Sequence, residues 1–247
     1  MGLVIAAAQS RSVSGDIARN VLRHLQFGRG AAECGAQLLV FPELSLTGYE
    51  PALAGANTVH PDSPCLYSLR RLAEEIQMTV VAGAPLRNDR DELHLAAFVM
   101  RPDGSVSVYT RKHLHSGEEA VFTPGTGGAL LRVGDSNVGL AICADTTHPE
   151  HAADSAARGA NIYAAGVLIT EAGYEPDTTL LQTYARQHRM AVVMANHSGT
   201  TGGYVSAGRS AMWAEDGQLV IADDGAEESL IVCTKQDGVW TGLIRQI

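Results

Sequence analysis

Apolar residues along this chain gather in short runs, and the segments between them often carry apolar side chains every three or four positions. The runs at 3–9 and 38–41 are apolar almost throughout, which is typical of strands buried on both faces. Residues 17–25 repeat apolar side chains along one helical face behind Asp16, a favourable capping residue. Further strands are expected at 79–82, 130–133, 138–142, 161–165, 191–195 and 229–234, with helices at 63–76, 149–158 and 180–188.

Two Asp-Gly turns between apolar runs predict β-hairpins. Residues 93–100 and 105–109 flank the first turn, and residues 211–214 and 219–222 flank the second. Hairpins combined with strand–helix units indicate mixed sheets, each covered by helices on one face and by a second sheet on the other. We therefore expect a four-layer α-β-β-α sandwich. No Pro-, Ser- or charge-rich linker interrupts the sequence, so one domain is expected over residues 1–247.

Composition narrows the class of protein. Apolar residues make up 45% of the 247, enough for a sizeable core, and the formal net charge of −9 argues against nucleic acid as a partner. No apolar run approaches the roughly 18 residues of a membrane span, and an apolar start without a basic leader predicts a strand rather than a signal peptide. The four cysteines are scattered without metal-type spacing, so we expect a cytoplasmic protein with reduced thiols.

Residues 139–150 read Gly-Leu-Ala-Ile-Cys-Ala-Asp-Thr-Thr-His-Pro-Glu and predict a buried strand that ends at Cys143, before a short turn and a helix. Pro149 at the first helical position, with Glu150 beside it, is a helix-start signal. A cysteine close to a helix N-terminus is expected to favour the thiolate, which is the nucleophilic form. Cys143 also fits the commoner role of a free cysteine, a small buried apolar residue. Asp145 is expected to hold the turn through local hydrogen bonds.

Two more polar side chains directly follow predicted strands. Glu43 comes after the strand at 38–41, where desolvation would raise its pKa and suit it to general-base catalysis; the alternative is an acid that only caps the next turn. Lys112 follows the strand at 105–109, where an ammonium would be able to stabilise an oxyanion; the alternative is a solvent-facing lysine. Because α/β sheets place their chemistry at the carboxyl ends of strands, the convergence with Cys143 favours a common site.

Taken together, these motifs resemble the nitrilase, or carbon–nitrogen hydrolase, superfamily. The resemblance rests on Pro42-Glu43, on Lys112 with Glu118 and Phe-Thr-Pro-Gly at 122–125, on Cys143 with Asp145 and Pro149-Glu150, and on the regions of Asn196 and of Gly-Arg-Ser at 208–210. It implies an α-β-β-α sandwich, usually dimeric or larger, with a Glu-Lys-Cys catalytic triad and neither a metal nor an organic cofactor.

Carried over by position, the resemblance implies that Glu43 takes the proton of Cys143 and later activates the hydrolytic water. Lys112 would stabilise the tetrahedral oxyanion, helped by the backbone N–H of Ala144. Cys143 would attack an amide or nitrile carbon and form a thioester, which divides one difficult substitution into two easier ones.

The sequence departs from the family pattern at several positions. Glu118 matches the second acid of many members, with Glu119 as the competing choice, but the spacing from Lys112 to Glu118 is one residue shorter than usual. Ala144 stands where an aromatic residue is common, which would leave room for a larger acyl group. His148 stands where a large apolar residue is common.

Three residues near the motifs are expected to bind substrate, namely Tyr49, His113 and Asn196, although Tyr49 fits packing of its loop equally well. The histidines near the motifs form no recognisable zinc pattern, so pocket lining or surface positions are expected for them and no metal site is predicted; they are His113, His115, His148 and His151.

The sequence therefore predicts an amidase that hydrolyses a small linear carboxamide to a carboxylic acid and ammonia, as a homodimer or larger homo-oligomer. A nitrilase or an N-carbamoyl amine hydrolase would use the same mechanism and differ in its products. A non-catalytic binding member of the family, suggested by the altered segment around Cys143, is the alternative outside the enzymes. The loops carry no readable code for the substrate itself.

Overall fold

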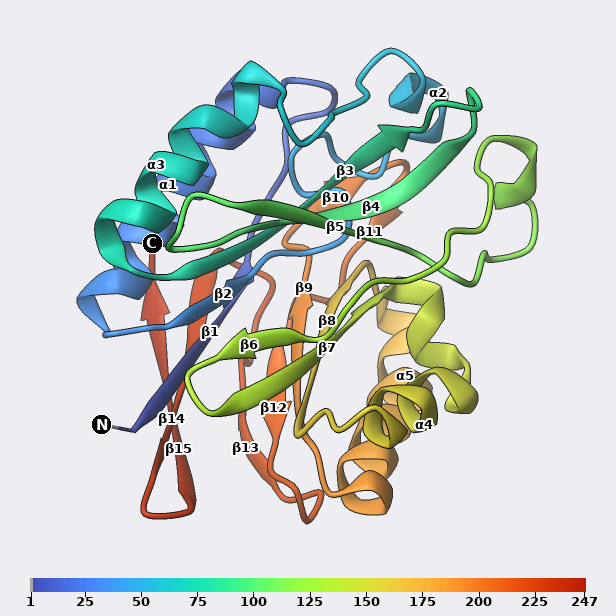
Figure 1. Ribbon diagram of the computed structural model, residues 1–247. Helices are drawn as coiled ribbons and strands as arrows, with labels where there is room; N and C mark the ends of the chain where they lie inside the picture. The colour runs from blue at the N-terminus through green and yellow to red at the C-terminus, as the bar shows by residue number, and fades with distance from the viewer. Residues whose placement is uncertain (1) are drawn as a thin grey trace.

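Two β-sheets lie face to face in the computed structural model, which describes residues 2–247, and helices cover the outer face of each sheet (Figure 1). Helices α1 (Ile17–Glu33) and α3 (Tyr67–Ile76) pack on the first sheet. Helices α4 (Pro149–Ala157) and α5 (Glu171–His188) pack on the second. The expected α-β-β-α sandwich is confirmed.

Both sheets are mixed, as the hairpins predicted. The seven-stranded sheet has the order β15 (Val239–Gln246), β14 (Ser229–Gln236), β1 (Leu3–Gln9), β2 (Leu38–Val40), β3 (Thr79–Arg87), β4 (Leu93–Met100) and β5 (Val106–Thr110). The six-stranded sheet has the order β13 (Leu219–Ala222), β12 (Ala211–Trp213), β9 (Ala191–Asn196), β8 (Ile162–Val167), β7 (Ser136–Ile142) and β6 (Leu131–Val133). The central strands β1, β2 and β3 are parallel to one another, and so are β7, β8 and β9, while antiparallel strands flank them.

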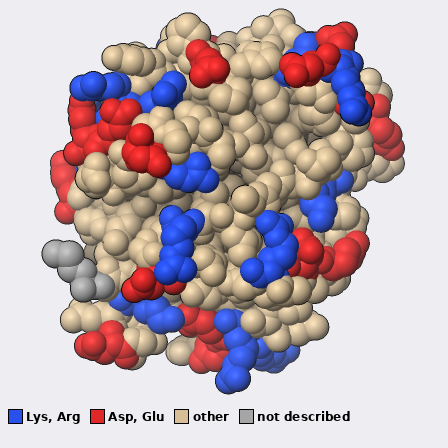
Figure 2. All heavy atoms as spheres, viewed as in Figure 1, with Lys and Arg blue, Asp and Glu red and all other residues tan. Residues whose placement is uncertain are grey.

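Short elements complete the chain. They are the ribbon of β10 (Thr200–Thr201) and β11 (Tyr204–Val205), helix α2 (Pro51–Ala54), and the 3₁₀ helices η1 (Pro64–Leu66), η2 (Glu118–Ala120) and η3 (Cys143–Thr147). Among residues 2–247, no helix is both long enough and apolar enough to cross a membrane. On the face shown in Figure 2, acidic and basic side chains are interspersed, without the broad basic surface that would follow a phosphate backbone.

Successive side chains of a strand point to opposite faces of its sheet, so each central strand contributes to two core layers. Ile5 and Ala7 of β1 face the other sheet, whereas Ala6 and Ala8 face α1 and α3. Such strands are buried on both sides and therefore appear as continuous apolar runs in the sequence. Strand β15 shows no such run because it is an edge strand with mostly exposed side chains, and the sequence analysis did not predict it.

Close backbone contacts bring the loop that carries Glu43 against both sheets. A Cβ atom on Gly83 of β3 would lie 2.4 Å from the backbone nitrogen of Leu44. A Cβ atom on Gly166 of β8 would lie 2.5 Å from the carbonyl oxygen of Phe41. Because glycine leaves this space free, the loop after β2 fits between the carboxyl ends of strands from the two sheets.

We expect Gly166→Ala to lower the free energy of unfolding by about 1–3 kcal/mol, the usual cost of forcing extra atoms into a packed interior. Urea unfolding followed by circular dichroism measures the loss. Gly225→Ala is a matched control, because the nearest atom to its added Cβ is 3.9 Å away. Equal destabilisation of the two variants would show that the contact between β8 and the Glu43 loop is not tight.

Candidate active site

Cys143 lies on a strained elbow between β7 and η3. Its φ angle is +39°, a conformation that residues other than glycine rarely adopt and that commonly marks functional sites. The residue is 7% exposed and lines a cavity of about 560 Å³. The elbow thus holds the thiol at the wall of an open cavity large enough for a small molecule.

Four other segments build the walls of this cavity. They are the loop after β2 with Glu43 and Tyr49, the segment around η2 with His115 and Glu118, the end of the β8–α5 loop and the start of α5 with Leu168, Ile169, Thr170, Gly173 and Asp177, and the β10–β11 ribbon with Gly202 and Tyr204. Sequence analysis had placed Glu43, Tyr49, Glu118 and Cys143 at one site, and the structure brings these four together.

The carboxyl group of Glu43 is buried, and only one of its two oxygens is hydrogen-bonded. Its Oε1 atom lies 2.5 Å from Nη1 of Arg111, while Oε2 has no hydrogen-bond partner among residues 2–247. Burial raises the pKa of Glu43 to about 7, although the guanidinium of Arg111 opposes the rise. The backbone carbonyl of Glu43 accepts a hydrogen bond from Nε2 of His197 at 2.6 Å, which helps to fix the loop. Glu43 therefore has the protonation behaviour of a general base at neutral pH.

Arg111 is the buried cation of the site. Its side chain is 0% exposed and bridges two carboxylates, Glu43 through Nη1 and Glu118 through Nη2. Glu118 also accepts hydrogen bonds from the hydroxyl of Tyr49 and the backbone N–H of His115, each at 2.6 Å. The guanidinium thereby ties together two of the segments that line the cavity.

Lys112 does not lie in this site, and its expected position was wrong by one residue. Its Nζ atom faces Asp154 at 4.0 Å, and its side chain is 35% exposed. The reason is strand alternation, which continues past the end of β5, so that Tyr109 and Arg111 are buried while Lys112 turns outward. The spacing from Lys112 to Glu118 was one residue shorter than is usual in the family. The spacing from Arg111 to Glu118 is one residue longer and so has the usual length.

The thiol of Cys143 is protonated at rest, contrary to the expectation of a thiolate. Burial, followed by the negative charge of Glu43, raises the pKa of Cys143 well above its ordinary value, and Arg111 only partly opposes this. Cys143 is the first residue of the five-residue 3₁₀ helix η3, and its pKa is raised despite this position. The sulfur lies 3.5 Å from Nε2 of His115. His115 lines the cavity, one of the two positions expected for the histidines near the motifs, but its contact with Cys143 was not predicted. Attack by Cys143 therefore requires a base.

Asp145 fastens the elbow to the segment that carries Arg111. Its Oδ1 accepts hydrogen bonds from the backbone N–H groups of Lys112 and His113, both at 3.0 Å. Its Oδ2 accepts from the hydroxyl of Tyr109 at 2.6 Å and from the N–H of Ile142 at 3.1 Å. The expected structural role of Asp145 is confirmed, and the structure shows that it reaches across both segments.

Ala144 contributes its backbone. It is the second residue of η3, and the first N–H groups of a helix have no carbonyl partner within that helix. The N–H of Ala144 follows directly on the nucleophile, where a donor to an oxyanion is needed. The side chain of Ala144 is fully buried and does not line the cavity, so the extra room for an acyl group expected there is not found.

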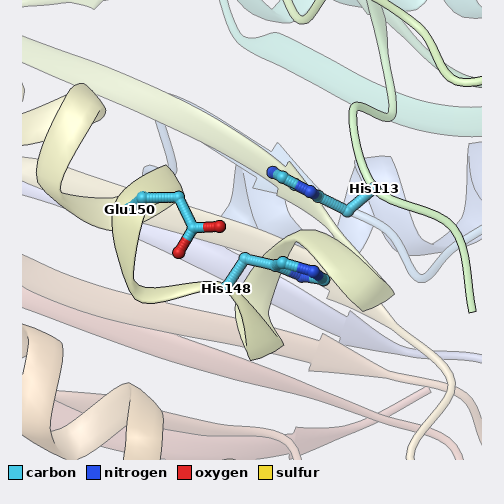
Figure 3. Close-up of side chains that lie close together, drawn as sticks. All are labelled: His113, His148 and Glu150. Atoms are coloured by element: carbon cyan, nitrogen blue, oxygen red, sulfur yellow. The ribbon is translucent and has the colours of Figure 1, made fainter.

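Two of the three expected substrate-binding residues lie outside the cavity. Tyr49 lines it, but His113 stacks on His148 with ring centroids 3.8 Å apart (Figure 3). Asn196 is fully buried, and its amide bonds the backbone N–H and carbonyl of Ile169 at 2.9 and 3.1 Å. Since Ile169 lines the cavity, Asn196 supports the wall instead of binding a ligand.

His113, His148 and Glu150 place their ligand atoms within 4.8 Å of one another (Figure 3). The two imidazole planes are inclined by only 13° and are stacked, so their in-plane lone pairs do not converge. A metal ion must lie about 2.0–2.1 Å from each nitrogen along these lone pairs. Nδ1 of His148 is also engaged by the carbonyl of Ala144 at 2.8 Å. These three side chains are therefore not arranged to bind one metal ion, and His148 instead contacts the elbow through Ala144.

Proteins of known family are similar to this chain in sequence and in fold. The sequence profile of the carbon-nitrogen hydrolase family matches residues 4–241. A nitrilase of Pyrococcus abyssi is 29% identical over 206 residues, covering 81% of this chain and 77% of the relative. An (R)-stereoselective amidase of Pseudomonas is 28% identical, covering 83% and 75%. A glutamine-dependent NAD(+) synthetase of Thermotoga maritima is 25% identical, and the match covers 93% of this chain but only 41% of that longer protein.

Solved structures of an amidase from Nesterenkonia sp. AN1 superpose closely. One of them has a TM-score of 0.85 and 26% identity, covers 98% of this chain and 90% of the amidase, and shows the acetamide moiety of fluoroacetamide added covalently at the active-site cysteine. Another, a mutant in complex with butyramide, has a TM-score of 0.85 and 27% identity and covers 96% and 92%. The family profile covers nearly the whole chain, and the fold matches that of a solved amidase. The chain therefore belongs to the carbon–nitrogen hydrolase family.

Proposed function

We propose that this hydrolase cleaves a small linear carboxamide to a carboxylic acid and ammonia through a thioester on Cys143. One observation carries the proposal. A thiol on a strained elbow at a cavity wall shares that cavity with Glu43, a carboxyl of pKa about 7 that has a free oxygen. The solved structures of the Nesterenkonia amidase with butyramide, and with the acetamide moiety of fluoroacetamide on its cysteine, support the choice of an amide.

Acylation begins when Oε2 of Glu43 takes the proton of Cys143. The sulfur then attacks the carbonyl carbon, and the carbonyl electrons move to oxygen. The positive charge of Arg111, which already acts on Cys143, and the N–H of Ala144 stabilise this oxyanion. The tetrahedral intermediate collapses, the C–N bond breaks, and Glu43 returns its proton to the nitrogen, which leaves as ammonia.

Deacylation uses Glu43 in the same way. Water enters the cavity, Glu43 takes one of its protons, and the oxygen attacks the thioester carbon. The second tetrahedral intermediate then collapses, the C–S bond breaks, and Glu43 returns the proton to sulfur, which releases the acid and restores the thiol. Arginine remains protonated throughout, so the protons of both half-reactions pass through Glu43, while Arg111 acts by charge alone.

The compound that is consumed and its products together separate the related activities. An amide and a nitrile both yield one acid and one ammonia, but the nitrile consumes two waters. An N-carbamoyl amine yields an amine, ammonia and carbon dioxide. Assay of ammonia and of carbon dioxide from each compound of a panel, tested separately, therefore shows which of the three substrate classes is hydrolysed.

Cys143→Ala should lower ammonia release from the best amide by at least about a thousandfold, because no thioester can form. Cys65→Ala is the control, since this half-buried cysteine lies in η1, away from the cavity. Retention of most activity in Cys143→Ala would rule out the proposed nucleophile.

The pH dependence of kcat/KM should show an acidic limb near pH 7. Glu43 accepts a proton only when ionised, so the rate should fall about tenfold per pH unit below its pKa of about 7. Burial lowers the pKa of His115 below its usual value, so its titration would give a limb below pH 6.5 instead. A rate constant independent of pH between 5.5 and 8 would contradict Glu43 as the base.

Substitution of the adjacent cations should separate their roles. Arg111→Met leaves two buried carboxyls without their cation and should cost about 3–5 kcal/mol of unfolding free energy, besides abolishing activity. Lys112→Met removes a partly exposed contact worth about 0–1 kcal/mol and should leave kcat within about twofold. Arg111→Lys tests whether charge alone is sufficient. A large loss of activity in Lys112→Met with little in Arg111→Met would reverse the assignment.

A further inference from the structure

The carboxyl groups that line the active-site cavity are not balanced by any Lys or Arg in the lining of residues 2–247. Glu43, Glu118 and Asp177 are its carboxyls, and no Lys or Arg side chain of residues 2–247 lines it. Among residues 2–247, Arg111 is the one Lys or Arg that forms an ion pair with these acids, and it is fully buried. A ligand in the cavity therefore meets acidic groups and no exposed cation.

Asp177 differs from the other two acids because it has no partner. Glu43 and Glu118 both contact Arg111, and Glu118 has two more donors. The carboxylate of Asp177, in the second turn of α5, makes no hydrogen bond and no ion pair with any of residues 2–247. It is half-buried, and burial raises its pKa. A partly desolvated carboxylate without a protein donor loses some of its hydration, and a bound cation would offset that loss.

His115 also acts on Asp177. Its Nε2 lies 3.5 Å from the sulfur of Cys143, and its positive form opposes the rise that burial causes in the pKa of Asp177. Burial lowers the pKa of His115 and so disfavours that positive form. Among residues 2–247, Asp177 therefore has no permanent cation as an ion-pair partner.

We propose that Asp177 is a specificity-determining residue that binds a protonated amine, or a similar cation, on the acyl chain of the amide substrate. The cavity of about 560 Å³ holds a short chain that joins such a group to the amide at Cys143. The same charge disfavours amides whose acyl chain ends in a carboxylate. This inference rests on the proposed amidase function and names its substrate class.

Three straight-chain amides of equal length test the proposal, with the chain ending in an ammonium, a methyl or a carboxylate group. We expect wild-type kcat/KM to be about tenfold or more higher for the ammonium amide than for the methyl amide, mainly through KM, and lowest for the carboxylate amide. Chains of four to six carbons should be compared, because the reach from Cys143 to Asp177 sets the best length.

Asp177→Asn should reduce the ammonium-over-methyl ratio by about tenfold. Glu175→Gln is the matched control, because it removes the same charge from an exposed position of the same helix and should preserve the ratio. Equal preference for the three amides in the wild type, or an equal loss for all three in Asp177→Asn, would overturn the proposal. Failure of the amidase function itself would look different, with no ammonia from any amide and no acyl group on Cys143.

Discussion

The site depends on one guanidinium buried between two carboxyls. Arg111 is inaccessible to solvent and bridges Glu43, which follows β2, and Glu118, in the segment after β5. A buried ion is costly unless its partners are close and well oriented, so the two acids must keep their positions for the fold to tolerate Arg111. The planar fork of arginine suits this geometry, because different nitrogens reach different carboxylates, whereas an ammonium would act as a single point charge. The arrangement also leaves one oxygen of Glu43 free to take a proton.

Cys143, the proposed nucleophile, is held by contacts of Asp145, which also bind the backbone next to Arg111. The strained backbone at Cys143 is fixed by Asp145, whose carboxylate bonds the elbow on one side and the backbone next to Arg111 on the other. Gly166 and Gly83 let the Glu43 loop approach both sheets. Glu43, Arg111 and Cys143, the proposed base, cation and nucleophile, thus follow the carboxyl ends of three strands, β2, β5 and β7. Such preorganisation is what a charge-stabilising site requires.

Much of this could be predicted from the sequence, for identifiable physical reasons. Apolar runs and Asp-Gly turns are local signals, so the layers and hairpins were predicted correctly, as were Glu43 and Cys143 at strand ends. Lys112 was predicted because it follows a strand and matches the lysine of the family triad. Arg111 was not considered, although period-two alternation from Tyr109 places Arg111 on the buried side. The protonation state of Cys143 could not be predicted, because it depends on burial and on Glu43, which is distant in the sequence. The places of His113, His115 and Asn196 depend on packing between segments, and the sequence carries no signal for it.

The central claim is that Cys143 forms a thioester while Glu43 and Arg111 handle protons and charge. Intact-protein mass spectrometry of enzyme quenched during turnover of an amide, followed by peptide mapping, tests it most directly. The account predicts a mass increase equal to that of the amide minus ammonia, located on the peptide that contains Cys143. Steady release of ammonia by an enzyme in which Cys143 never carries the acyl group, under conditions that trap a thioester, would contradict it.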